Sequence, residues 1–203
     1  MKTLQKTGLV LLILISLYLL SGSFAKSVYQ VQRTLTMQAP PNLIFDQVAV
    51  LRNWEQWSPW KEKDPGVQYR YEGEEGKAGS MLIWSGDQER SGTGQIRIES
   101  LTKPYVLNYV LQFAEPYKMQ SKGSFVFTQL ESDKTAVKWV DEGDIPYLMR
   151  PVLMFMDIDV MLGPDFERGL FKIDSISRLV YRDKLMADSL NANSNPELKR
   201  INQ

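Results

Sequence analysis

The feature that most restricts the fold of this chain is a series of short strands followed by one long amphipathic helix. Between about residues 67 and 142, apolar and polar side chains alternate in short stretches that turn residues separate. The clearest alternation lies in residues 105–113. Turns so closely spaced favour antiparallel hairpins over the long crossovers that join parallel strands. We therefore expect an antiparallel sheet from this part of the chain.

The helix that follows the strands carries an apolar stripe. Its members recur at spacings of three and four residues: Phe166, Leu170, Ile173, Ile176 and Val180. Such a stripe has to be buried, and the sheet is the only large surface available to it. The chain is therefore predicted to be an α+β protein in which a long C-terminal helix lies across a curved antiparallel sheet.

The region before the strands contains shorter elements. Residues 28–37 alternate in the manner of a half-buried strand, and Ala39–Asn42 ends that strand and offers a helix start. Residues 54–60 are rich in tryptophan and are interrupted by a proline. We expect this last segment to be a packed loop.

The N-terminal segment is apolar and follows two lysines. Gly8–Leu20 comprises thirteen residues without a charge, and the uncharged stretch runs on to Ala25. A signal anchor needs about 17 or more apolar residues, and the whole stretch suffices if its Ser and Gly positions are counted. A signal peptide needs a shorter apolar run and a small-x-small cleavage site, which Ser23-Phe24-Ala25 supplies. The two interpretations predict a single-pass protein of the cytoplasmic (inner) membrane or a secreted, periplasmic protein cleaved after Ala25. Both place the rest of the chain outside the cytoplasm, because the lysines stay inside.

The composition excludes several classes of site. The 203 residues include no histidine and no cysteine, and 24 Lys and Arg balance 24 Asp and Glu. There is consequently no disulfide, no thiolate nucleophile and no imidazole, either as a base or as a metal ligand. The balanced charge gives no sign of the basic face that nucleic acid requires. We expect no metal, no cofactor and no nucleic-acid partner, so that any catalysis would depend on carboxylates, Tyr, Lys, Ser or Thr.

Four motifs in a fixed order resemble a known superfamily. They are Val31–Phe45 (VQRTLTMQAPPNLIF), Trp57-Ser58-Pro59-Trp60 with Asp64-Pro65, the pattern Gly79…Trp84-Ser85-Gly86…Gly92-Thr93-Gly94, and Gly163–Leu170 (GPDFERGL). Over about residues 28–180 their order and spacing are similar to the START-like, or polyketide cyclase/dehydratase (SRPBCC), superfamily. The chain looks most like the branch with one N-terminal membrane segment. The resemblance implies a helix-grip fold with an apolar cavity between the sheet and the long helix, and it carries over no set of catalytic residues.

The C-terminal region is expected to be helical in two pieces. Residues 148–162 form the first, Gly163-Pro164 breaks it, and Asp165 caps the second. The last residues are polar and are predicted to be disordered. The chain then divides into an anchor or signal peptide over 1–25, a helix-grip domain over 26–188 and a disordered tail over 189–203.

Several apolar side chains are candidates for the wall of the implied cavity. Seven are aromatic: Trp60, Trp84, Tyr109, Phe113, Phe125, Phe127 and Trp139. Four come from the helical region: Met154, Ile158, Phe166 and Leu170. These residues either line a pocket for a lipid or another hydrophobic molecule, or fill an ordinary core.

Two charged residues share the inward face of predicted strands. Asp141 has the strand parity of Trp139, and Arg33 has that of Val31. A buried charge needs a partner, so the sequence predicts an ion pair between Arg33 and Asp141. An unpaired Asp141 would have a raised pKa and could act as an acid or base, which makes it the one weak catalytic candidate.

Methionines concentrate just before the long helix. Four of the nine fall within thirteen residues: Met149, Met154, Met156 and Met161. Methionine fills irregular space, so this segment is core or pocket wall, or it lies against the membrane with Arg150 at the headgroups. Asp157 and Asp159 are two residues apart, and on a helix they face different directions, which makes them a poor metal pair.

Three functions remain open from the sequence. The favoured one is a membrane-tethered, extracytoplasmic binding module that holds a hydrophobic small molecule or lipid without chemistry. The second is a cyclase or dehydratase-like enzyme using Asp141 and a tyrosine, which requires at least two polar side chains converging in the cavity. The third is a structural envelope protein without a ligand, which predicts no cavity larger than a few waters.

Overall fold

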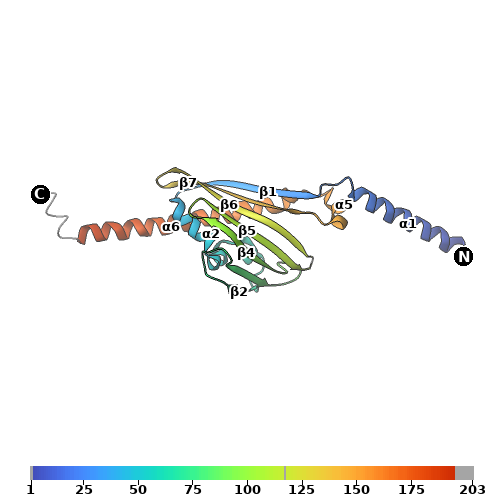
Figure 1. Ribbon diagram of the computed structural model, residues 1–203, viewed down its shortest axis with the longest axis horizontal. Coiled ribbons are helices and arrows are strands. Elements are labelled where there is room, and N and C mark those ends of the chain that lie inside the picture. Colours follow the sequence, from blue (N-terminus) through green and yellow to red (C-terminus); the bar gives the residue numbers. More distant parts are fainter. Residues whose placement is uncertain (1, 117, 195–203) are drawn as a thin grey trace.

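A seven-stranded sheet with one long helix packed on it forms the body of the protein, in a computed structural model that describes residues 2–116 and 118–194 (Figure 1). The strands are β1 (Val28–Met37), β2 (Gln68–Glu72), β3 (Met81–Ser85), β4 (Thr93–Thr102), β5 (Val106–Glu115), β6 (Met119–Glu131) and β7 (Lys134–Asp144). Their order across the sheet is β1-β7-β6-β5-β4-β3-β2, and every neighbouring pair is antiparallel. The predicted antiparallel sheet is confirmed.

Helices lie before, within and after the run of strands. The two long ones are the N-terminal α1 (Lys2–Gly22) and the C-terminal α6 (Ile158–Ser194). The short ones are α2 (Pro41–Ala49), η1 (Leu51–Asn53), α3 (Trp54–Trp57), α4 (Pro59–Lys63), η2 (Tyr147–Met149) and α5 (Arg150–Leu153). α6 packs mainly against β1 and also contacts α2 and β7. The α+β class and the helix-grip arrangement are as predicted.

The core lies between the inner face of the sheet and the helices. Along β7, Thr135, Val137, Trp139 and Asp141 are buried while the residues between them are more exposed. This alternation is what a sheet with one covered face requires. The ring of Phe125 in β6 stacks on that of Trp139, with 4.8 Å between the centroids. The neighbouring strands thus contribute one continuous aromatic layer.

The tryptophan-rich segment is helical, which corrects the predicted loop. Trp54 and Trp57 lie on α3, and their indole N–H groups donate to the carbonyls of Val48 (2.9 Å) and Gln47 (3.0 Å). Pro59 stands in the first turn of α4. A proline is tolerated there because its missing N–H would have had no intrahelical partner. The proline therefore starts a helix where the sequence suggested a break.

The long helix runs through Gly163-Pro164, where a break was predicted, and begins earlier, at Ile158. Arg33 of β1 explains this continuity. Its guanidinium donates to Asp159 (2.7 Å) and to Glu167 (2.6 Å), which lie on either side of the proline turn. A Cβ at Gly163 would lie 1.8 Å from Arg33 Nη2, so any larger residue there would displace the guanidinium from this position.

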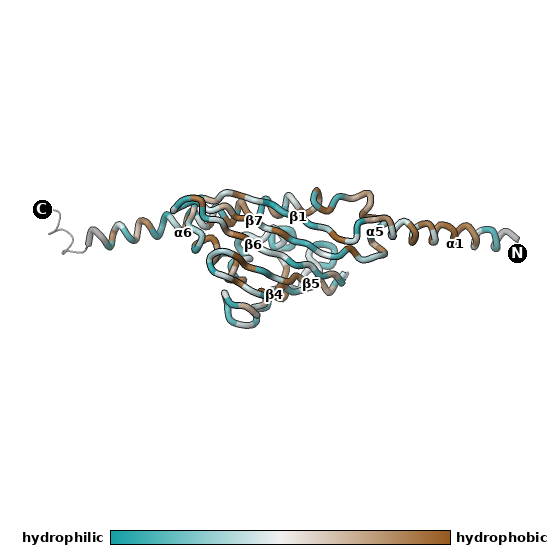
Figure 2. The backbone as a smooth tube through the Cα atoms, turned by 45° about the horizontal axis from the view of Figure 1, so that its top comes forward, coloured by the Kyte–Doolittle hydropathy of each residue, from teal (hydrophilic) through white to brown (hydrophobic). Residues whose placement is uncertain are grey.

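α1 and the C-terminal part of α6 project from opposite ends of the body (Figure 1). α6 extends through residues 189–194, the first part of the segment predicted to be a disordered tail, and 195–203 lie outside the described residues. In α1 the segment Gln5–Gly22 is long and apolar enough to cross a membrane by length and composition, with a mean hydropathy of 1.6. Figure 2 shows this hydrophobic stretch along α1.

Candidate functional site

A cavity of about 170 Å³, partly open to the surface, lies between the sheet and the helices. Its wall is mostly apolar and comes from β1, the segment 54–69, the strands β3–β7 and the start of α6. The lining residues are Tyr29, Trp54, Ser58, Trp60, Val67, Tyr69, Leu82, Trp84, Ser91, Ile96, Tyr109, Leu111, Phe113, Met119, Trp139, Asp141, Leu162 and Phe166. Four of the five tryptophans of the chain are among them.

The structure places the eleven pocket candidates in three locations. Six are on the cavity wall: Trp60, Trp84, Tyr109, Phe113, Trp139 and Phe166. Phe125, Phe127 and Leu170 are buried in the core cluster and are absent from the wall. Met154 and Ile158 line a separate groove next to the end of α1. The helical break falls between α5 and α6, so Met154 and Ile158 lie at this junction.

Sequence reasoning missed several wall residues that the topology brings in. Tyr29 is one, although it has the same strand parity as Val31 and could have been found by that signal. Trp54 and Tyr69 also line the cavity. No pattern in the sequence indicated that the segment carrying Trp54 contributes to the cavity wall.

Asp141 is the centre of a polar cluster on the cavity wall. Its Oδ1 accepts a hydrogen bond from the Tyr29 hydroxyl at 3.1 Å. Its Oδ2 accepts from the Ser121 hydroxyl at 3.0 Å and from the Tyr109 hydroxyl at 3.4 Å. The Tyr109 oxygen in turn accepts from the indole N–H of Trp139 at 2.8 Å. Three hydroxyl donors thus surround a buried carboxylate.

Two glycines of the sheet make room for this cluster. A Cβ at Gly123 would lie 1.9 Å from Cζ of Tyr109, and one at Gly143 would lie 2.9 Å from Cε1 of Tyr29. Gly123 is the cross-strand partner of both Tyr109 and Asp141, and Gly143 is that of Tyr29. Each ring therefore lies flat on a glycine, and this position lets its hydroxyl reach the carboxylate from another strand.

The predicted ion pair between Arg33 and Asp141 is wrong. Both side chains have the expected parity, but Arg33 is level with Trp139 in the sheet, and Asp141 is level with Val31. Arg33 instead pairs with Asp159 and Glu167 of α6. Helix carboxylates at 2.6–2.7 Å satisfy the guanidinium, and hydroxyl groups satisfy Asp141.

Comparison with solved structures identifies the architecture. Norcoclaurine synthase from Thalictrum flavum, in complex with dopamine and hydroxybenzaldehyde, matches with a TM-score of 0.56 at 9% identity, over 76% of this chain and 89% of that one. The Zhui aromatase/cyclase from Streptomyces sp. R1128 matches with a TM-score of 0.55 at 16% identity, over 74% and 94%. Ginseng major latex-like protein 151 from Panax ginseng gives 0.55 at 11%, over 75% and 99%. This chain has a helix-grip fold. No family model and no curated protein sequence matches the chain.

The helix-grip cavity of this protein shifts the pKa values of the groups in its polar cluster. Burial raises the pKa of Asp141 to about 6, against the opposing effect of the hydrogen bonds from Ser121, Tyr29 and Tyr109. Burial, together with the neighbouring carboxylate of Asp141, raises the pKa of the Tyr29 and Tyr109 hydroxyls well above 10. Asp141 is thus the one group of the cluster that can change protonation near neutral pH.

The polar side chains of this helix-grip site can form hydrogen bonds and transfer a proton. Within residues 2–116 and 118–194, no group of three or more Asp or Glu side chains is arranged to hold a metal ion. The cavity offers one carboxylate, hydroxyl donors and a large aromatic surface. Such a wall can bind an apolar molecule and hydrogen-bond one polar group on it.

Proposed function

We propose that the protein is a binding module for a small, largely apolar molecule, which it holds in the helix-grip cavity. The observation that supports this proposal is a cavity with an aromatic and aliphatic wall and one carboxylate, Asp141, which accepts hydrogen bonds from hydroxyl groups. Burial of the ligand's apolar surface supplies the affinity, at about 25 cal/mol per Å² before the cost of ordering the ligand. Asp141 and its hydroxyl groups orient a polar group on the ligand.

The size of the cavity narrows the ligand class. Drug-sized ligands occupy pockets of about 300–1,000 Å³, whereas an apolar cavity of about 150 Å³ can bind benzene. A cavity of about 170 Å³ therefore suits one aromatic ring or a short acyl segment. It also exceeds the space of a few waters, at about 30 Å³ each, which argues against a structural protein with a filled core.

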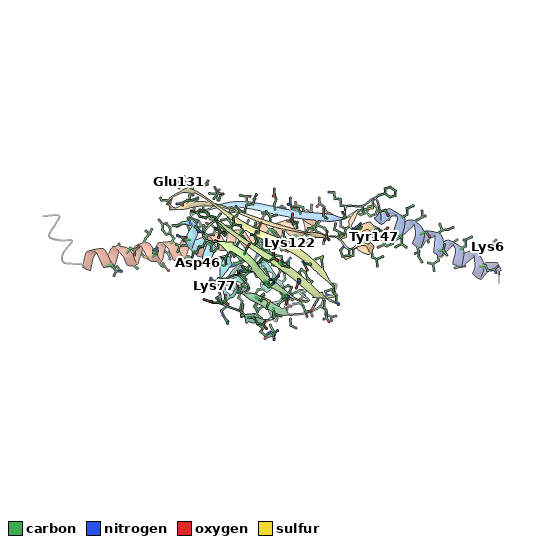
Figure 3. All side chains as sticks on the ribbon, viewed as in Figure 1. Lys6, Asp46, Lys77, Lys122, Glu131 and Tyr147 are labelled. Carbon is green, nitrogen blue, oxygen red and sulfur yellow. The ribbon has the colours of Figure 1, made fainter. Side chains whose placement is uncertain are left out.

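The second part of the proposal is that α1 is an uncleaved anchor that holds the domain on the outer face of the cytoplasmic membrane. The end of α1 is docked on the body: the Tyr18 hydroxyl donates to the Leu148 carbonyl, and the Tyr147 hydroxyl donates to the Leu19 carbonyl. In Figure 3, Tyr147 lies where α1 meets the body, and Lys6 lies towards the far end of the helix. Cleavage after Ala25 would remove these contacts, so they favour the anchor.

A second candidate function is acid–base catalysis at the same site. The enzyme interpretation requires polar side chains that converge in the cavity, and Asp141, Tyr29 and Tyr109 do so. With a pKa of about 6, Asp141 is suited to exchange a proton near neutral pH. On this candidate, Asp141→Asn abolishes turnover of the bound substrate while leaving binding intact. On the binding proposal there is no turnover to lose.

Mass spectrometry of small molecules extracted from the purified full-length protein tests the binding proposal. We expect a co-purifying apolar compound in the wild type and its loss in Leu111→Trp, because the larger side chain fills the cavity. The matched control is Leu130→Trp at the exposed end of β6, which should retain the compound. The same yield from all three proteins, or none from the wild type, would contradict the proposal.

A further inference from the structure

The segment around α5 exposes an unusually apolar surface beside the end of α1. Among the described large apolar residues, Phe155 (90% exposed) and Phe24 (80% exposed) are the most exposed. Leu148, Val152 and Met154 are also at least half exposed. We call these five residues the α5 patch. Their exposure to water is unfavourable, so the patch needs an apolar neighbour.

The α5 patch adjoins the apolar N-terminal helix. Gly22 at the end of α1 packs against Tyr147 and Pro151, to which a Cβ would come within 3.4–3.5 Å. The hydroxyl of Ser23 lies 2.9 Å from that of Tyr147. If α1 crosses a bilayer, the patch therefore lies at the surface from which α1 emerges. The bilayer is the apolar neighbour that this arrangement provides.

A groove of about 670 Å³ opens within the α5 patch. Phe24, Met154 and Phe155 of the patch line it with Ile158, and its wall also carries charged side chains: Lys26, Arg150, Asp157 and Asp159. Tyr29 is the one described residue that lines both this groove and the cavity. Its ring, whose hydroxyl donates to Asp141, therefore lies between the two spaces.

We propose that this groove is the entrance through which an apolar molecule dissolved in the bilayer reaches the cavity, with Tyr29 as the gate. The inference rests on the proposed binding function and on the anchor. β1 is an edge strand, and Gly143 beneath the Tyr29 ring presents no side chain to block rotation. Opening the gate costs the hydrogen bond to Asp141, while the core stays in place.

The first test measures whether the α5 patch contacts lipid. The chain has no cysteine, so Phe155→Cys and the control Leu130→Cys each carry a single NBD fluorophore when labelled. The full-length variants are reconstituted into phosphatidylcholine vesicles that contain doxyl-labelled lipid, a quencher that resides in the bilayer. We expect quenching at position 155 and little at 130. Equal quenching at both positions, or none at 155, would overturn the proposal.

The second test measures passage through the gate. The full-length protein in phosphatidylcholine nanodiscs is mixed with 4-fluorotoluene, and ¹⁹F NMR exchange spectroscopy gives the rate between lipid-dissolved and cavity-bound probe. Tyr29→Phe keeps the ring but loses the hydrogen bond to a charged group, so we expect exchange to be about tenfold faster or more. The matched control is Tyr71→Phe, whose hydroxyl also donates to a carboxylate, that of Glu55, outside the cavity.

The outcomes separate the entrance from the binding function. Faster exchange in Tyr29→Phe alone supports the gate. An unchanged rate in Tyr29→Phe, or equal acceleration in Tyr71→Phe, overturns it even if the cavity binds the probe. A wild-type protein with no bound signal instead contradicts the binding function, and the entrance falls with it.

Discussion

The Tyr29 hydroxyl donates a hydrogen bond to Asp141 Oδ1 over 3.1 Å, from a ring that lies on Gly143. This contact joins the edge strand β1 to β7 on the cavity wall. It also shows how the fold accommodates a buried carboxylate without a cation: hydroxyl groups from β1, β5 and β6 take the place of an ion pair. Hydroxyl groups stabilise the charge less than a guanidinium would, and the pKa of Asp141 rises to about 6.

The raised pKa of Asp141 predicts a specific pH dependence of stability. The folded state binds the proton more tightly than the unfolded state, so Asp141 destabilises the fold above pH 6 and stops doing so as the pH falls towards 4. The free energy of unfolding of Asp141→Asn, relative to the wild type, should therefore improve by about 2–3 kcal/mol between pH 4 and pH 7.5. Urea denaturation at both pH values measures it. A difference that does not vary with pH would show that Asp141 titrates normally.

Tyr29→Phe gives the companion result. Loss of the Tyr29 hydroxyl removes a hydrogen bond to the charged form of Asp141, so the pKa of Asp141 should rise further. The pH at which Asp141 begins to destabilise the fold should therefore also rise. A transition at unchanged or lower pH would contradict the assigned role of this hydroxyl.

The two glycines under the tyrosine rings should differ in their tolerance of a methyl group. Gly123→Ala places a Cβ 1.9 Å from the buried Tyr109 ring, whereas Gly143→Ala meets the half-buried Tyr29 ring at 2.9 Å. We expect Gly123→Ala to cost about 2–4 kcal/mol of unfolding free energy and Gly143→Ala to cost less. Gly66→Ala, whose nearest contact would be 3.7 Å, is the control. Thermal unfolding of the three variants checks this order. An unchanged stability of Gly123→Ala would contradict the claim that the Tyr109 ring has to lie against residue 123.

The effect of Gly163→Ala on the free energy of unfolding should have opposite signs in the presence and absence of Arg33. A methyl group there displaces the Arg33 guanidinium, so the variant should lose about 1 kcal/mol although alanine normally stabilises a helix. With Arg33→Ala present, the same change should gain about 0.5–1 kcal/mol. The double-mutant cycle measures the coupling between the two residues. Additive effects would contradict the account of how α6 continues through Pro164.

The strands could be predicted from the sequence, but the identities of charge partners could not. Period-two alternation determines which face a side chain occupies, and Arg33 and Asp141 do face inward. Alternation does not give the position of α6 relative to β1, and Asp159 and Glu167 on that helix decide the partner of Arg33. For the same reason the sequence did not show that Met154 and Ile158 line the groove beside α1 and not the cavity.

The anchor proposal predicts the mass of the protein in its membrane. Intact-mass spectrometry of the chain extracted from membranes should give the full-length species, because the contacts of Tyr18 and Tyr147 favour a retained α1. A shorter species that has lost residues up to Ala25 would contradict the anchor. It would also remove the bilayer from the proposed route of entry.

The most direct measurement of the central claim is calorimetric titration of the full-length protein with toluene. A cavity of about 170 Å³ walled by aromatic side chains should bind toluene with a Kd of about 0.1–1 mM and a negative heat-capacity change. Leu111→Trp should abolish the signal, and Leu130→Trp should leave it unchanged. Absence of binding by the wild type, or equal binding by all three proteins, would contradict the claim that the helix-grip cavity is a site for small apolar molecules.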